Sequence, residues 1–114
     1  MADRSIFRLR DMHDSISHIM SLLSAKSMDD LFHDPFLRAA FERFLEVMSE
    51  VSRHIPGHWK ADYPDIEWRK IADLGNHLRH AYHKTDYEIL WRVYENELPG
   101  LHEATGELLR KWEA

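Results

Sequence analysis

The chain has 114 residues, contains no cysteine, and carries a net charge of -5 at pH 7. This length fits one domain, so we expect residues 1–114 to fold as a single unit. The absence of cysteine excludes disulfides and thiolate zinc sites and fits a reducing cytoplasm, while the lack of a long apolar run or hydrophobic leader argues against a membrane span or signal peptide.

The first half of the chain predicts two long helices with a short one between them. Asp3 can cap a first helix that ends near Ser24, because its apolar residues recur at helical spacing. Ser27, followed three residues later by Asp30, resembles a capping box. Asp34 before Pro35 is another start signal, for a helix that reaches about Arg53. We expect that helix to bury Phe36, Ala40, Phe44, Val47, Met48 and Val51.

The second half predicts further helices separated by a loop. We expect residues 54–63 to be the longest unstructured segment, because Pro56 and Gly57 end the preceding helix. A third helix, with Pro64 at or just before its start, should end near His80 or Tyr82. Its apolar face would be Trp68, Ile71 and Leu74, and the fourth helix, which starts at Thr85 and Asp86, should bury Ile89, Leu90, Trp91 and Val93.

A break at Leu98-Pro99-Gly100 precedes a last helix, from Pro99 to about Trp112. No segment shows the alternation of a half-buried strand. The sequence therefore predicts an all-α fold, an up-and-down bundle of four or five helices.

Polar side chains concentrate in residues 74–83, which contain three histidines within ten residues. On a continuous helix, Asn76, Arg79, His80 and His83 would share one stripe, because residues three and four apart lie on one face. Histidine is the side chain that titrates closest to neutral pH. The stripe is therefore a candidate for proton transfer, phosphate binding or metal binding.

The same segment resembles the signature of the HepT-like family, small helical proteins of the HEPN superfamily. The resemblance lies in Asn76, Leu78, His80 and Tyr82 at alternate positions, then Asp86 and the run 89–91. The segment 63–68 resembles the family's approach to the third helix. Glu50 matches the glutamate of a Gly-Glu-Ala element that faces the active-site helix in the family, although its neighbours here are Ser49 and Val51.

The resemblance implies a HEPN-like fold and a metal-independent ribonuclease toxin paired with a nucleotidyltransferase antitoxin. It implies that His80 is the acid or base, and that the partner attaches AMP to Tyr82. We expect Arg79 and Asn76 to contact phosphate, with Glu50, His77 and His83 in supporting positions, and no cofactor. Such proteins usually form homodimers, so we expect one here.

The family motif has an arginine five residues before the histidine, and that position is Gly75 here. Glycine inside a helix costs about 1 kcal/mol relative to alanine, which suggests a packing or close-approach reason for it. Arg79, Arg69, Lys70 or an arginine of a partner subunit could replace the missing guanidinium.

The alternative is a catalytically degenerate binding module that dimerises and binds a nucleotidyltransferase or a nucleotide. The net charge of -5, which disfavours general attraction to nucleic acid, and Gly75 favour it. A metal site at His77, His80 and His83 is less favoured, since no carboxylate ligand is obvious nearby.

Overall fold

The computed structural model describes residues 4–113, which form seven helices and no strand. The helices are α1 (Ser5–Leu23), α2 (Met28–His33), α3 (Pro35–Ser52), α4 (Gly57–Lys60), α5 (Trp68–Arg79), α6 (Lys84–Asn96) and α7 (Leu98–Glu113). The predicted all-α fold is confirmed, with five long helices and two short ones. Asp3, the expected cap of the first helix, lies outside the described residues.

The local start signals in the first half of the chain act as predicted. Ser27 and Asp30 form a complete capping box at the start of α2, each side chain accepting the other residue's backbone N–H. The carboxylate of Asp34 accepts the backbone N–H groups of Phe36 and Leu37, and Pro35 occupies the first position of α3. Side-chain oxygens thus satisfy helix N–H groups that have no partner within the helix.

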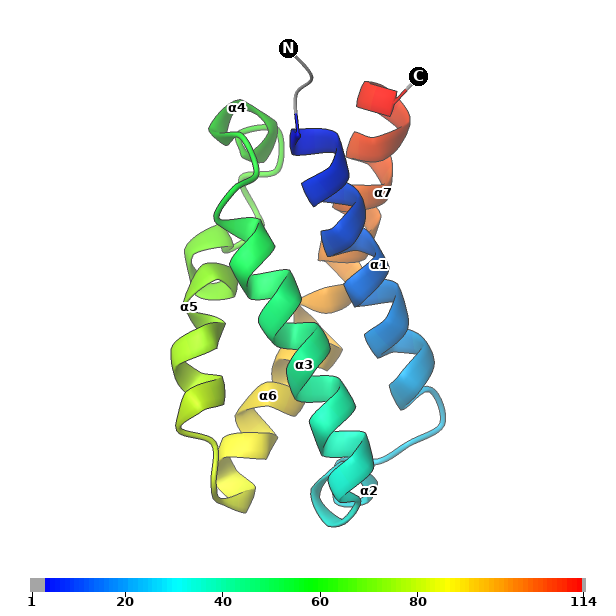
Figure 1. Ribbon diagram of the computed structural model, residues 1–114, viewed down its shortest axis with the longest axis vertical. Coiled ribbons are helices and arrows are strands. Elements are labelled where there is room, and N and C mark those ends of the chain that lie inside the picture. The colour runs from blue at the N-terminus through cyan, green and yellow to red at the C-terminus, as the bar shows by residue number, and fades with distance from the viewer. Residues whose placement is uncertain (1–3, 114) are drawn as a thin grey trace.

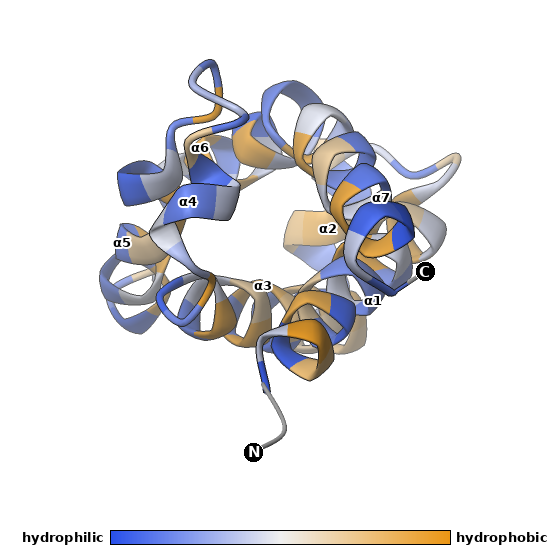
Figure 2. Cartoon of the chain, turned by 90° about the horizontal axis from the view of Figure 1, so that it is seen from above, coloured by the Kyte–Doolittle hydropathy of each residue, from blue (hydrophilic) through white to orange (hydrophobic). Residues whose placement is uncertain are grey.

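The long helices pack side by side in an elongated body of 45 × 26 × 25 Å. Helix α1 packs against α3 and α7, and α3 packs on its other side against α5 (Figure 1). Helix α6 contacts α7 and the short α2. Seen from above, each long helix carries both hydrophobic and hydrophilic residues, as a helix between a core and solvent should (Figure 2). This arrangement leaves α5 at one edge of the bundle with α3 as its neighbour.

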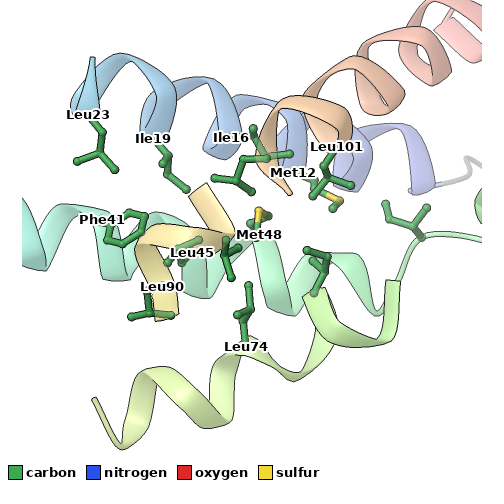
Figure 3. Close-up of a cluster of buried hydrophobic side chains, with 14 of the residues drawn as sticks. Met12, Ile16, Ile19, Leu23, Phe41, Leu45, Met48, Leu74, Leu90 and Leu101 are labelled. Carbon is green, nitrogen blue, oxygen red and sulfur yellow. The ribbon is translucent and has the colours of Figure 1, made fainter. Parts of the chain in front are cut away.

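The core draws fully buried side chains from every long helix. Figure 3 shows these side chains converging between the helices: Met12, Ile16, Ile19 and Leu23 of α1, Phe41, Leu45 and Met48 of α3, Leu74 of α5, Leu90 of α6 and Leu101 of α7. Burial of such aliphatic and aromatic surface is the main force that holds the helices together. Because Leu74 is part of this core, α5 is fixed by packing along its apolar face.

The predicted inner face of α3 is wrong in part, because Phe44 and Val51 pack against the core but are only partly buried. Phe36 is 85% exposed, and the buried apolar residues are Leu37, Phe41, Leu45 and Met48. Only Met48 belongs to both sets. Apolar residues are so dense in this helix that two neighbouring stripes both fit the helical period, and contact with α1 and α5 selects one of them.

Three smaller expectations in the second half also need correction. Ile89 is 46% exposed, whereas Leu90 and Val93 are buried as predicted. The segment 54–63 is not wholly unstructured, because α4 lies within it and buries Trp59. Pro64 lies four residues before α5 rather than at its start, since the chain forms turns at residues 61–62 and 64–65 before α5 begins.

Candidate functional site at the end of α5

The last turn of α5 stops at Arg79, and His80 is its C-terminal cap. His80 has φ -116° and ψ 17°, outside the regular helix, and its backbone N–H donates to the carbonyl of His77 at 3.2 Å. Helix α6 begins at Lys84. Residues 80–83 are therefore a turn between two helices. On an ideal helix, His80 and Tyr82 would point in nearly opposite directions. This constraint does not apply here, because α5 ends before both residues.

The carboxylate of Asp86 holds this turn in place. One of its oxygens accepts the backbone N–H of His83 at 2.8 Å and that of Tyr82 at 2.9 Å. These bonds, first from His83 and then from Tyr82, hold the pKa of the Asp86 carboxyl below its usual range. Asp86 was expected at a helix start and in the family resemblance, and its place three residues after His83 is the spacing of a capping box.

A second anchor lies behind the turn at Tyr87. The buried Tyr87 hydroxyl donates to Glu42 of α3 at 2.6 Å, and the carbonyl of Ala81 lies 3.4 Å from it. Burial, and then the bond to Glu42, raise the pKa of Tyr87 to about 12. The phenol therefore stays neutral and able to donate at physiological pH. It ties the turn to α3.

The candidate side chains of this turn face solvent. Tyr82 is 75% exposed, so it does not pack as a core tyrosine. His77, His80 and His83 are also exposed. His83 caps α6 rather than continuing the stripe of α5, so the expected stripe of four residues stops at His80.

Asn76 and Arg79 lie one turn apart on α5 and contact each other. The guanidinium of Arg79 donates to the side-chain carbonyl of Asn76 at 2.6 Å. Both side chains are exposed, and the contact leaves the remaining N–H groups of Arg79 free for other acceptors. A positioned guanidinium thus directly precedes His80 in the chain.

A groove of about 520 Å³ runs between α3 and α5 and has Gly75 in its wall. A Cβ added at Gly75 would have Ser49 Oγ as its nearest neighbour, at 4.0 Å. The expected close-approach reason for this glycine is therefore wrong. Glu50 also lines the groove, so α3 brings it to the same hollow as Gly75 and Arg79. The groove lining does not include His77, His80, Tyr82 or His83.

Two arginines of this groove were missed because they come from another helix. Arg43 of α3 and Arg53, which caps the C-terminus of α3, line it together with Arg79 of α5. The guanidinium of Arg53 donates to the carbonyl of Ala72 on α5 at 2.8 Å, and Ser49 Oγ donates to the same carbonyl at 3.1 Å. That Ser49 and Arg53 lie beside Ala72 follows only from the packing of α3 against α5.

The other cations considered as replacements lie elsewhere. Lys70 bonds Glu97 at 2.9 Å and lies 3.7 Å from Glu67, and neither it nor Arg69 lines the groove. Within residues 4–113, no three His, Asp or Glu side chains gather as a metal site would require. In the same range, no helix is long and apolar enough to cross a membrane.

A family model and the two relatives described next are all named as ribonucleases. A family model described as "Ribonuclease HepT-like" matches residues 12–108. The "Probable ribonuclease HepT" of Thermococcus cleftensis is 32% identical over 103 residues, which cover 90% of this chain and 93% of that protein. The "Putative RNase TTE0752" of Caldanaerobacter subterraneus is 32% identical over 85 residues, covering 75% of this chain and 76% of that protein. No solved structure matches the chain.

Proposed function

This chain belongs to the ribonuclease HepT-like family, and we propose that it cleaves RNA without a metal ion at the turn between α5 and α6. The observation that carries the proposal is the exposed turn itself. It presents His80 directly after the Arg79 and Asn76 pair, with Tyr82 two residues further on. Asp86 and Tyr87 hold its backbone in place.

The chemistry needs a base and a cation. The 2′-hydroxyl of a ribose attacks the adjacent phosphorus, and His80 takes its proton. A bond forms from the 2′-oxygen to phosphorus while the bond to the 5′-oxygen breaks. The departing 5′-oxygen takes a proton, which the imidazolium of His80 can return. Negative charge builds on the phosphate oxygens, and the guanidinium of Arg79, with the amide of Asn76, stabilises that charge.

Tyr82 is the proposed control point of this activity. In the proposed toxin-antitoxin system, a nucleotidyltransferase partner transfers AMP to its hydroxyl. The 75% exposure of Tyr82 supports access by such a partner. The added phosphate would place negative charge and bulk two residues from His80, and so repel the RNA backbone. A homodimer in the cytoplasm remains part of this proposal.

The second candidate is a binding module that holds phosphate but does not cut. Gly75 favours it, because one cation of the family motif is absent from its usual position. The net charge of -5 also disfavours general attraction to RNA. In this case, the dimer would bind its nucleotidyltransferase partner or a nucleotide through the same turn.

Cleavage of RNA in the presence of EDTA separates the two candidates. We expect the unmodified protein to cleave and His80→Ala to lose at least about a hundredfold in rate, the usual contribution of an acid or base. His18→Ala is the control, because it removes another exposed imidazole, on α1. Equal cleavage by the wild type and His80→Ala would remove His80 from the mechanism. No cleavage by folded protein with Tyr82 unmodified, checked by intact mass, would favour the binding module.

A further inference from the structure

The groove between α3 and α5 contains two guanidinium groups that have no carboxylate partner in the described part of the chain. Within residues 4–113, no ion pair involves Arg53 or Arg79, and their bonds go to the carbonyl of Ala72 and the amide of Asn76. The chain has 20 acidic and 15 basic residues, so unpaired cations are not forced by composition. Two such groups lining one hollow suggest an anionic ligand.

The remaining charged groups of the groove are one ion pair and one glutamate. Arg43 is paired with Glu46, whereas Glu50 contributes a negative charge, and its neighbour His54, 3.6 Å away, does not line the groove. Three arginines against two glutamates leave the groove with one net positive charge, in a chain whose net charge is -5. The basic character of the groove therefore comes from Arg53 and Arg79.

The two guanidinium groups are separated along α5. Arg53 bonds the carbonyl of Ala72, and Arg79 lies seven residues after Ala72 on α5. Seven residues correspond to about 10 Å along the helix axis. Gly75 lies between them and contributes no side chain to the groove. Groups this far apart fit successive parts of a phosphate chain better than a single phosphate ion.

The groove continues towards the candidate catalytic turn. A second hollow shares Arg43, Glu46 and Arg79 with it and extends to Leu78, two residues before His80. A strand lying along α5 past Arg53 and Arg79 would therefore reach the turn at His80. The groove is lined by residues of α5 and of α3 with its C-terminal cap; Figure 1 shows α5 at the left of the bundle and α3 beside it.

We propose that Arg53, at the C-terminal cap of α3, supplies the cation that is absent at Gly75, and that Arg53 and Arg79 bind the backbone phosphates of a single-stranded RNA lying in this groove. Guanidinium is the group best suited to this, because its planar fork matches two phosphate oxygens. The bond to the Ala72 carbonyl holds the Arg53 guanidinium against α5, although its backbone caps α3. The identity of the ligand as RNA rests on the proposed function, whereas the anion site itself does not.

Binding of a short single-stranded RNA with 2′-O-methyl riboses tests this directly, because such RNA lacks the attacking hydroxyl. Fluorescence anisotropy should show about tenfold weaker binding for Arg53→Ala than for the wild type. The slope of log affinity against log salt should fall by about 0.7, the loss of one phosphate contact on a single strand. Arg53→Lys should recover only part of the affinity. Arg69→Ala is the matched control, because it removes an exposed arginine of α5 that does not line the groove.

The second part of the experiment restores a guanidinium to the groove from α5. Gly75→Arg, combined with Arg53→Ala, should regain affinity, since the groove has room for a side chain at that position. Equal binding by Arg53→Ala and Arg69→Ala, with helicity intact by circular dichroism, would overturn the proposal. So would preferential binding of ATP over the RNA, which would assign the groove to a free nucleotide.

The outcomes also separate this proposal from the proposed function. Arg53-dependent binding without any cleavage of ordinary RNA would keep the groove and remove the nuclease. His80-dependent cleavage that is unaffected in Arg53→Ala, together with unchanged binding, would keep the nuclease and remove the groove.

Discussion

Glycine at position 75 is unfavourable for the stability of α5, and it also leaves the site without the arginine of the family motif. It lies in α5, where a glycine is less favourable than almost any other residue, yet nothing within 4 Å except Ser49 Oγ opposes a side chain. Packing therefore does not require the glycine. The glycine places no side chain in the groove, where Arg53 and Arg79 make no ion pair within residues 4–113.

We predict that Gly75→Ala stabilises the protein by up to about 1 kcal/mol, because alanine has the higher helix propensity and less backbone freedom in the unfolded chain. Urea denaturation measures this difference. Gly106→Ala in α7 is the comparison, since its Cβ would meet His13 Cε1 at 3.4 Å and Arg110 Nη1 at 3.6 Å. We expect a smaller gain there. A loss of stability in Gly75→Ala would mean that this position needs glycine for a reason absent from its surroundings.

At the scale of elements, the contact between α1 and α7 includes a pair of stacked imidazoles. The rings of His13 and His102 lie 4.4 Å apart between centroids. His13 also bonds Thr105 Oγ1 at 2.7 Å, and His102 bonds Ser17 Oγ at 2.8 Å. Burial, and then the charge of His102, lower the pKa of His13, with Arg110 lowering it further and Asp14 opposing them. Two protonated rings at this distance would repel each other.

The protein should therefore lose stability as the pH falls below about 6.5, the ordinary histidine value. The pKa of His13 is lower in the folded state, so the unfolded chain takes up the proton first and acid favours unfolding. The contribution of neutral His13 to the free energy of unfolding is fully present above about pH 6.5. It is lost as the pH falls through the pKa of His13 in the folded state. Urea unfolding at pH 7.5 and pH 5.5 measures it. A His13→Gln variant should lose less stability on acidification, and an equal loss would assign the effect to other groups.

The sequence could predict the long helices better than the faces that they bury. Ser27, Asp30 and Asp34 mark helix starts through bonds to residues two or three positions away, so local sequence contains that information. The inner face of α3 depends on its neighbours, and Phe36 and Leu37 could not be distinguished by spacing alone. Likewise, the place of Arg53 in the groove depends on how α3 packs against α5.

At the scale of the whole molecule, the bundle places its candidate chemistry at one edge. The core fixes α5 through Ile71 and Leu74, while Asn76 and Arg79 stay exposed. The segment 74–83 was identifiable from its histidines, and the end of α5 was predicted to within a few residues. The anchoring of the turn by Tyr87 and Glu42 was not, since those residues are 45 positions apart.

The central claim, metal-independent cleavage through the 2′-hydroxyl, is tested most directly by the ends of the products. The measurement compares two RNAs in EDTA, one of which has a single 2′-deoxyribose at a mapped cleavage site. The mechanism predicts 2′,3′-cyclic phosphate and 5′-hydroxyl ends on the ordinary RNA, and no cleavage at the deoxyribose. Cleavage at the deoxyribose, 3′-hydroxyl ends, or loss of all activity in EDTA would contradict it.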